Sequence, residues 1–235
     1  GDRLAYLLNT QGKTQLFVQW LNGGETAKVT TLPQSPRSIV WSPNGKHIAF
    51  TRHVPAPPPT LADMPAKPKG AKWAEPATVV DRMTFRFDGS GYLPSGNQQV
   101  FVVPADGGTP RQMTSGDYPI NGSVSWMPDS KSIVFSSNRR ENVEYHPRQN
   151  DLYAASLTDG ELTQMTDHAG PEGNPAVSPN GRYLAYTSAA DTRQGYNRAD
   201  LRVMDLTSGE SRSLTADLDR SVSDIQWSAD SKSVW

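Results

Sequence analysis

Residues 39–50 read Ile-Val-Trp-Ser-Pro-Asn-Gly-Lys-His-Ile-Ala-Phe, with an apolar run on either side of a turn sequence. Proline presets φ for the first central position of a type I turn, asparagine suits the second, and glycine is tolerated at the next position. The flanking runs are short and rich in β-branched and aromatic residues, which is typical of strands. The stretch therefore predicts a tight hairpin between two buried strands.

This pattern returns three times, at residues 124–135, 175–186 and 225–235. Tryptophan occupies one fixed position in three of the four copies, as Trp41, Trp126 and Trp227. A repeated position of this kind favours packing in a core over a carbohydrate-binding platform. Repetition of whole hairpins is the signature of a repeat architecture.

A second hairpin pattern lies between these copies and consists of an apolar run, a turn with glycine and a closing threonine. Two hairpins in about 50 residues make four strands, which is one blade of a β-propeller. We therefore predict an all-β β-propeller with about four four-stranded blades across residues 1–235. The closing threonines lie 84, 52 and 49 residues apart, at Thr30, Thr114, Thr166 and Thr215.

The ends of the chain fall inside the repeat. Residues 1–6 match residues 45–50, and the last copy stops within the same strand. We therefore expect a fragment of a larger propeller, since propellers close with about four to eight blades. Exposed end blades would favour self-association, or closure as a four-bladed ring, through residues near Leu4, Tyr6, Trp227 and Val234.

The longest interval between closing threonines contains an insertion at about residues 53–78. It holds three consecutive prolines at 57–59 and no alternation of apolar and polar residues. We expect an extended excursion outside the blade, with the chain rejoining the sheet at residues 79–87.

Composition excludes several classes of function. The formal net charge is −1, from 23 Lys and Arg against 24 Asp and Glu, so neither nucleic acid nor an anionic membrane is an expected partner. The chain has no cysteine, which excludes disulfides and thiolate metal sites but suits either the cytoplasm or the periplasm. No apolar run approaches the roughly 18 residues that span a bilayer.

The sequence predicts no catalytic residue, metal site or cofactor. A nucleophile elbow needs Gly-x-Ser-x-Gly, and Ser90 in Asp-Gly-Ser-Gly lacks that spacing. No phosphate-binding loop or dinucleotide fingerprint is present. The four histidines show no metal-ligand spacing among themselves: His47, His53, His146 and His168.

The repeat resembles the propellers of two groups. One is the periplasmic propeller protein of the Tol-Pal system, and the other is the N-terminal propeller of prolyl-oligopeptidase-family serine peptidases. Residues 70–117, which include Val-Pro-Ala-Asp-Gly-Gly-Thr-Pro-Arg-Gln at 103–112, resemble the acylaminoacyl-peptidase and dipeptidyl-peptidase-like branch. That resemblance implies a propeller that selects short peptides for an α/β-hydrolase domain of the same polypeptide, absent from this chain. The Tol-Pal resemblance instead implies a protein-binding propeller without an enzyme.

The densest charged loop, residues 138–151, supplies the candidate substrate-binding residues. Several Arg and Glu side chains in one loop can bind a peptide's amine, carboxylate or backbone through charge-assisted hydrogen bonds. In the dipeptidyl-peptidase branch, acidic propeller side chains hold the substrate amine. The alternative is a solvated loop whose ion pairs each contribute under ~1 kcal/mol. The candidates are Arg139, Arg140, Glu141 and Glu144.

Overall fold

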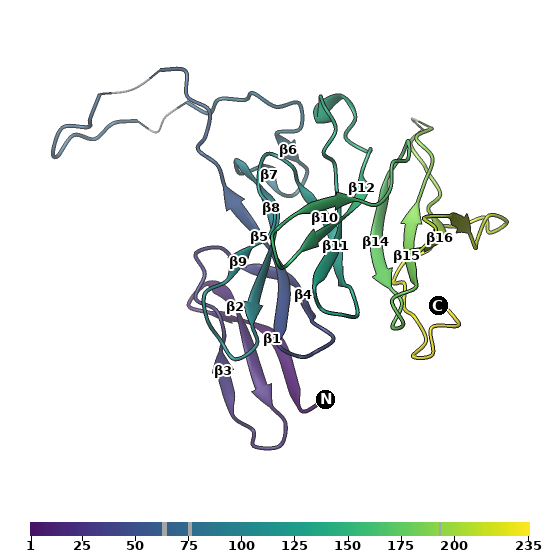
Figure 1. Ribbon diagram of the computed structural model, residues 1–235. Helices are drawn as coiled ribbons and strands as arrows, with labels where there is room; N and C mark the ends of the chain where they lie inside the picture. The colour runs from purple at the N-terminus through teal and green to yellow at the C-terminus, as the bar shows by residue number, and fades with distance from the viewer. Residues whose placement is uncertain (63–64, 75–76, 193) are drawn as a thin grey trace.

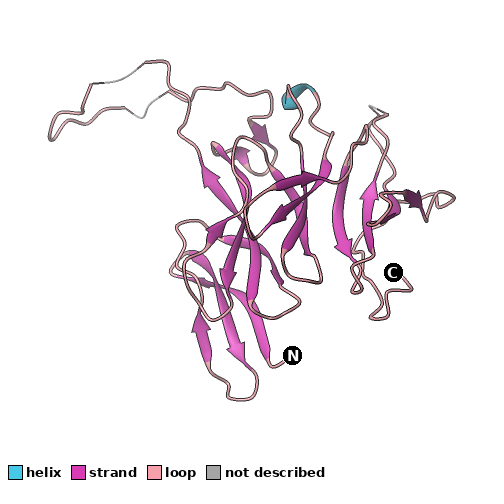
Figure 2. Ribbon diagram, viewed as in Figure 1, coloured by secondary structure: helices cyan, strands magenta, loops and turns pink. Residues whose placement is uncertain are grey.

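The computed structural model describes residues 1–62, 65–74, 77–192 and 194–235, and its strands form antiparallel sheets in chain order (Figures 1 and 2). The all-β prediction is confirmed. Apart from one 3-10 turn, η1 (Val143–Tyr145), the elements in the described residues are strands. Three sheets there have four strands each, with orders β4-β5-β8-β9, β10-β11-β12-β13 and β14-β15-β16-β17.

The strand bounds follow the repeat. The first sheet is β1 (Arg3–Thr10), β2 (Lys13–Trp20) and β3 (Thr26–Lys28). The second is β4 (Pro36–Trp41), β5 (His47–Pro55), β8 (Gly96–Pro104) and β9 (Arg111–Gln112). The third is β10 (Ile120–Trp126), β11 (Ser132–Ser137), β12 (Asp151–Ser156) and β13 (Leu162–Gln164). The fourth is β14 (Glu172–Val177), β15 (Tyr183–Ser188), β16 (Asp200–Asp205) and β17 (Ser211–Ser213).

Both ends of the chain contribute partial blades, as the phase of the repeat predicts. The first sheet has three strands, because β1 matches β5, β11 and β15 in the repeat and is therefore a second strand. The last copy of the hairpin contributes only the bridge between Trp227 and Val234. Leu4 on β1 is 50% exposed. Self-association through the ends stays a prediction.

The repeated turn is held by its own side chains. Ser42 Oγ donates to Asn44 Oδ1 at 2.8 Å and accepts from the His47 N–H at 2.9 Å. Gly45 has φ of 66°, a left-handed conformation that glycine adopts without strain. Residues 178–183 repeat these contacts. The turn chemistry read from the sequence is therefore the chemistry of the hairpin.

In the third sheet, serine replaces the turn glycine and joins two sheets. Ser130 has φ of 61° and is 6% exposed, and its hydroxyl accepts from the Asn44 N–H of the second sheet at 3.1 Å. The Trp126 indole, 5% exposed, donates to the Val40 carbonyl of the same neighbouring sheet at 3.1 Å. The repeated tryptophan therefore packs in the interior at this copy and also hydrogen-bonds across the blade boundary.

The closing threonines make the same hydrogen bond in each of these four sheets. Each hydroxyl accepts a hydrogen bond from the backbone N–H of the residue fourteen positions earlier, at 2.9–3.0 Å. This bond replaces the ladder pairing where the fourth strand leaves the third. The pairs are Thr30 with Leu16, Thr114 with Val100, Thr166 with Leu152 and Thr215 with Leu201.

Apolar side chains fill the spaces between successive sheets. Phe50, Phe135 and Tyr186 occupy the same position of the repeat and are at most 1% exposed. Burial of side chains this large supplies about 1.5–3 kcal/mol each relative to exposure. The hydrophobic effect therefore acts mainly across blade faces, as the apolar strands predict.

The insertion leaves the sheet later and returns later than expected. β5 runs through Pro55, which pairs with Gly96 at the start of β8. The chain therefore rejoins the sheet at Gly96 and not at residues 79–87. A turn at residues 88–90, with Gly89 at φ of 77°, folds β6 (Arg86–Phe87) back onto β7 (Gly91–Tyr92). Residues 63–64 and 75–76 of the predicted insertion lie outside the described residues.

Candidate functional site

The long connections leave the sheets at one end. Loops 56–95, 138–150 and 189–199 each join a second strand to a third, whereas the short hairpin turns join first strands to second. In an antiparallel meander these two kinds of connection lie at opposite ends. Loop 56–95 is called the excursion below. Figure 1 shows η1 and the described part of the excursion together at the upper end. We call the surface formed by these three loops the long-loop face.

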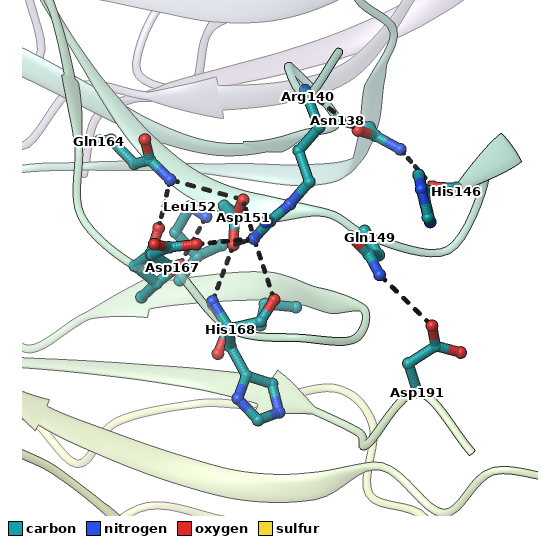
Figure 3. Close-up of polar contacts among 12 residues, drawn as sticks. Asn138, Arg140, His146, Gln149, Asp151, Leu152, Gln164, Asp167, His168 and Asp191 are labelled. Carbon is teal, nitrogen blue, oxygen red and sulfur yellow. Dashed lines mark hydrogen bonds and ion pairs between the residues drawn. The ribbon is translucent and has the colours of Figure 1, made fainter. Parts of the chain in front are cut away.

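Arg140 is held in the third blade by two ion pairs and a hydrogen bond (Figure 3). Its Nη2 lies 2.9 Å from Asp151 Oδ2 and 2.8 Å from Asp167 Oδ1, and donates to the His168 carbonyl at 3.1 Å. The Asp151 side chain is 1% exposed, and it also accepts from the His168 N–H at 3.1 Å. This buried carboxylate and its cation connect strand β12 to the segment that leads into β14.

The position of Asp151 holds a glutamine in the first two sheets. Gln99 stands where Asp151 stands, directly before the residue whose N–H binds the closing threonine. Its amide donates to the Gly116 and Tyr118 carbonyls in the segment that leads to the next sheet. A carboxylate cannot donate, so Arg140 supplies the donor. Arg140 therefore serves as a blade clamp.

The two candidate glutamates differ in their surroundings. Glu141 is exposed. Glu144 lies in η1, and its Oε1 accepts from the Met83 N–H of the excursion at 3.1 Å. The preceding residue, Arg82, donates to both carboxylate oxygens of Asp117 at 3.0 and 3.1 Å. Consecutive residues of the excursion are thus attached to two different loops.

Arg139 lies close to two tyrosine rings. Its guanidinium carbon is 4.8 Å from the ring centre of Tyr118 and 5.6 Å from that of Tyr153. Nε and Nη2 are buried without a hydrogen-bond acceptor, and no ion pair to Arg139 is present in the described part of the chain. Burial lowers the pKa of Arg139, against the opposing influence of both tyrosines.

Two hollows open on the long-loop face. One, of about 320 Å³, lies between η1 and the loop 189–199, where Gln149 Nε2 donates to Asp191 Oδ2 at 3.4 Å (Figure 3). The other, of about 280 Å³, lies at the base of the excursion beside Arg82 and Asp117. The first hollow is lined by Tyr145, His146, Pro147, Arg148, Gln149 and Asp191.

Other features of the described residues add no chemistry to this face. No group of three or more His, Asp or Glu side chains there could hold a metal ion. No helix among these residues has the length and apolar character to cross a bilayer. Ser90, the serine considered for a nucleophile elbow, lies in the turn between β6 and β7.

Glu172 is a buried carboxyl that the sequence did not predict. Glu172 begins β14 and is 4% exposed, and its Oε2 has no hydrogen-bond partner. Burial raises its pKa, while the hydroxyl of Thr166, the His168 side chain and the hydroxyl of Ser188 lower it and the charge of Asp151 raises it. Aligning the inner strands could have found it, because β4 begins with proline and β10 with isoleucine.

Glu172 predicts a pH dependence of stability. Because its folded pKa is raised above the usual 4.5, the folded protein retains a proton that the unfolded chain releases. The stability that the retained proton of Glu172 contributes is complete below about pH 4.5, and it is lost as the pH rises through the folded pKa. We expect Glu172→Gln to raise Tm relative to wild type at pH 8 and to have a smaller effect at pH 4, measured by calorimetry.

The matched control for this experiment is Glu141→Gln, which removes an exposed carboxyl from the same face. Its Tm should follow wild type across the pH range, because an exposed carboxyl has similar surroundings in both states. Parallel Tm curves for Glu172→Gln and wild type between pH 4 and 8 would contradict the assignment.

Comparison with known proteins gives relatives and structures of similar fold. Dipeptidyl-peptidase 5 of Porphyromonas gingivalis is 25% identical over 250 residues, which cover 100% of this chain and 35% of the relative. An acylaminoacyl peptidase structure from Pyrococcus horikoshii has a TM-score of 0.66 at 16% identity and covers 96% of this chain and 32% of its own. The TolB structure from Acinetobacter baumannii has a TM-score of 0.60 at 16% identity, covering 99% and 45%.

These structural likenesses confirm the propeller fold. The chain spans about a third of the length of the curated dipeptidyl-peptidase 5 relatives, at 35% and 30%.

A family match covers the candidate site. The family described as "Dipeptidyl peptidase IV (DPP IV) N-terminal region" matches residues 72–194, more than half of the 235 residues. The matched range includes the whole charged loop at 138–151, with both clamp residues Arg140 and Asp151. It confirms the resemblance to peptidase propellers that residues 70–117 indicate. The chain therefore belongs to the dipeptidyl peptidase IV N-terminal region family.

Proposed function

We propose that this chain is the substrate-selecting propeller domain of a serine peptidase of the prolyl-oligopeptidase family. The observation that carries the proposal is the family match over residues 72–194. In this proposal the propeller admits short peptides, with acylated or free N-termini, to an α/β-hydrolase domain of the same polypeptide. The long-loop face, with its charged side chains and hollows, is the surface that selects them.

The geometry of the long-loop face supports a binding role. Loops placed on a rigid β scaffold commonly carry binding residues. The hollow of about 320 Å³ lies within the size range of small-ligand sites and is bordered by both charges, from Arg148 and Asp191. Short peptides carry both charges and hydrogen-bonding backbone groups. Size and charge together therefore suit a peptide of a few residues.

The test uses the full-length polypeptide and the 235-residue chain side by side. We expect a fluorophosphonate probe to label a serine of the full-length protein and none in the 235-residue chain, which has no nucleophile elbow. The full-length protein should hydrolyse dipeptidyl or acyl-aminoacyl chromogenic substrates but leave unfolded casein intact. Equal cleavage of casein would contradict the size selection.

A second candidate is a protein-binding propeller without an enzyme, favoured by the TolB likeness over 99% of this chain. In that case the full-length protein would take up no fluorophosphonate, and its partner would be a protein bound by the propeller. Self-association through the end blades remains a separate proposal, and light scattering at micromolar concentration measures it.

A further inference from the structure

Comparison of the blades separates repeated architecture from features that occur once. The closing threonine recurs in all four repeats, and the position before its partner holds Gln15, Gln99, Asp151 or Asp200. In the fourth sheet Arg198 Nη2 lies 2.9 Å from Asp200 Oδ1, which repeats the arrangement of Arg140 and Asp151. These residues hold blades together.

Arg139 has a partial counterpart in the second blade, where the Arg52 guanidinium lies 4.4 Å from the ring centre of Phe101 and donates from Nη1 to Gln34 Oε1 at 3.0 Å. The equivalent positions, four residues after Phe50 and Tyr186, hold Val54 and Ala190. Four residues after the closing threonine, the third-blade entry holds Tyr118, whereas the corresponding position before the fourth blade holds Gly170. The arginine of the second blade therefore has a hydrogen-bond acceptor, whereas Arg139 lies over two rings and has no acceptor at Nε and Nη2.

The surroundings of Arg139 leave its charge uncompensated. The guanidinium lies over the rings of Tyr118 and Tyr153, as in cation–π pairs. They leave Nε and Nη2 without an acceptor. The adjacent Arg140, in contrast, lies within 3.0 Å of two carboxylates. A desolvated cation without an anion is unfavourable, and a carboxylate matches the paired N–H groups of a guanidinium.

We propose that Arg139, framed by Tyr118 and Tyr153, recognises a carboxylate of the bound peptide and makes the long-loop face selective for peptides that carry one. This inference rests on the proposed function and names the substrate class. Tyr118 is 36% exposed, so this side of the pair can be reached from solvent. A carboxylate that approaches Arg139 gains a strong, charge-assisted pair.

The excursion fixes the distance between the two loops that form this site. Arg82 binds Asp117, the neighbour of Tyr118, and the Met83 N–H binds Glu144, on the loop that follows Arg139. These contacts link the loop bearing the ring to the loop bearing the cation. Arg82 and Glu144 are thus positioning residues for the carboxylate site.

The carboxylate could belong to an acidic side chain or to the peptide C-terminus, and two peptide pairs distinguish these sources. The first pair differs only in Glu against Gln, with an amidated C-terminus. The second pair contains Gln and differs only in a free against an amidated C-terminus. The amidated Gln peptide belongs to both pairs, so the full-length protein is assayed for kcat/KM with three peptides, and calorimetry measures binding of the same three.

We expect wild type to prefer one carboxylate peptide over its neutral partner by about tenfold, as a charge-assisted hydrogen bond provides. Arg139→Gln should abolish that ratio by lowering kcat/KM for the carboxylate peptide toward that of its neutral partner. Arg139→Lys should keep part of the ratio, since the charge remains and the planar fork is lost. The control Arg212→Gln, an exposed arginine on β17, should leave the ratio unchanged.

The outcomes separate the two proposals. Cleavage of all three peptides with equal ratios in wild type and Arg139→Gln would overturn the carboxylate site and leave the peptidase function standing. A lowered Tm for Arg139→Gln with an unchanged ratio would show that Arg139 only packs against the tyrosines. If nothing is cleaved, the peptidase function fails, and a calorimetric preference lost in Arg139→Gln would still support the site. Absence of both cleavage and binding overturns both proposals.

Discussion

Asp151→Ala is expected to destabilise the folded protein by about 3 kcal/mol, because it removes one partner from a buried ion pair. The substitution leaves the His168 N–H without its acceptor and Arg140 with only the exposed Asp167. The estimate lies at the lower end of the range of about 3–5 kcal/mol, since the Arg140 side chain keeps 30% exposure. Urea unfolding of the 235-residue chain measures the loss.

A double substitution tests the interpretation of this pair as a blade clamp. Asp151→Gln with Arg140→Ala recreates the arrangement of Gln99, whose amide both accepts from Thr114 and donates to the next segment. The double variant should recover to within about 1 kcal/mol of wild type, the size of one net hydrogen bond. The control Asp219→Ala removes an exposed carboxylate and should change stability by under about 1 kcal/mol. A double variant no more stable than Asp151→Ala would reject the equivalence.

Thr114→Val should cost about 2–4 kcal/mol. Thr114 is 2% exposed, and its hydroxyl accepts from the Val100 N–H at 2.9 Å and donates to Gln99 Oε1 at 2.6 Å. Valine keeps the shape but leaves two buried polar groups unpaired, each at about 1–3 kcal/mol. Thr207→Val, in an exposed turn, should stay within about 0.5 kcal/mol of wild type. Equal stability of the two variants would show that the hydroxyl is dispensable.

The sequence predicts most of the blade because the hairpins depend on local chemistry. Proline, asparagine and glycine at residues 43–45 specify the turn with no help from the rest of the chain. Because the turn is specified locally, its residues also identify the copies of the repeat. The position of the clamp could also have been found from the sequence, because Gln99 and Asp151 each lie fifteen residues before their closing threonine.

Non-local contacts account for what the sequence could not predict. The limits of the excursion depend on the pairing of Pro55 with Gly96, 41 residues apart, which no local pattern specifies. Arg139 lies in the predicted charged loop, but its ring partner Tyr118 comes from the connection between two sheets. Loop composition indicated where charged residues gather. Only the fold showed that Arg140 is committed to the blade and that Arg139 has no carboxylate partner in the described residues.

The excursion also has a consequence for the order of folding. The β11–β12 ladder closes at Ser137 and Asp151, 14 residues apart, whereas the β5–β8 ladder closes at Pro55 and Gly96, 41 apart. Closing the longer loop costs about 1 kcal/mol more chain entropy. Contacts that are distant in sequence also form more slowly. We therefore expect the third blade to assemble from neighbouring hairpins before the second blade does.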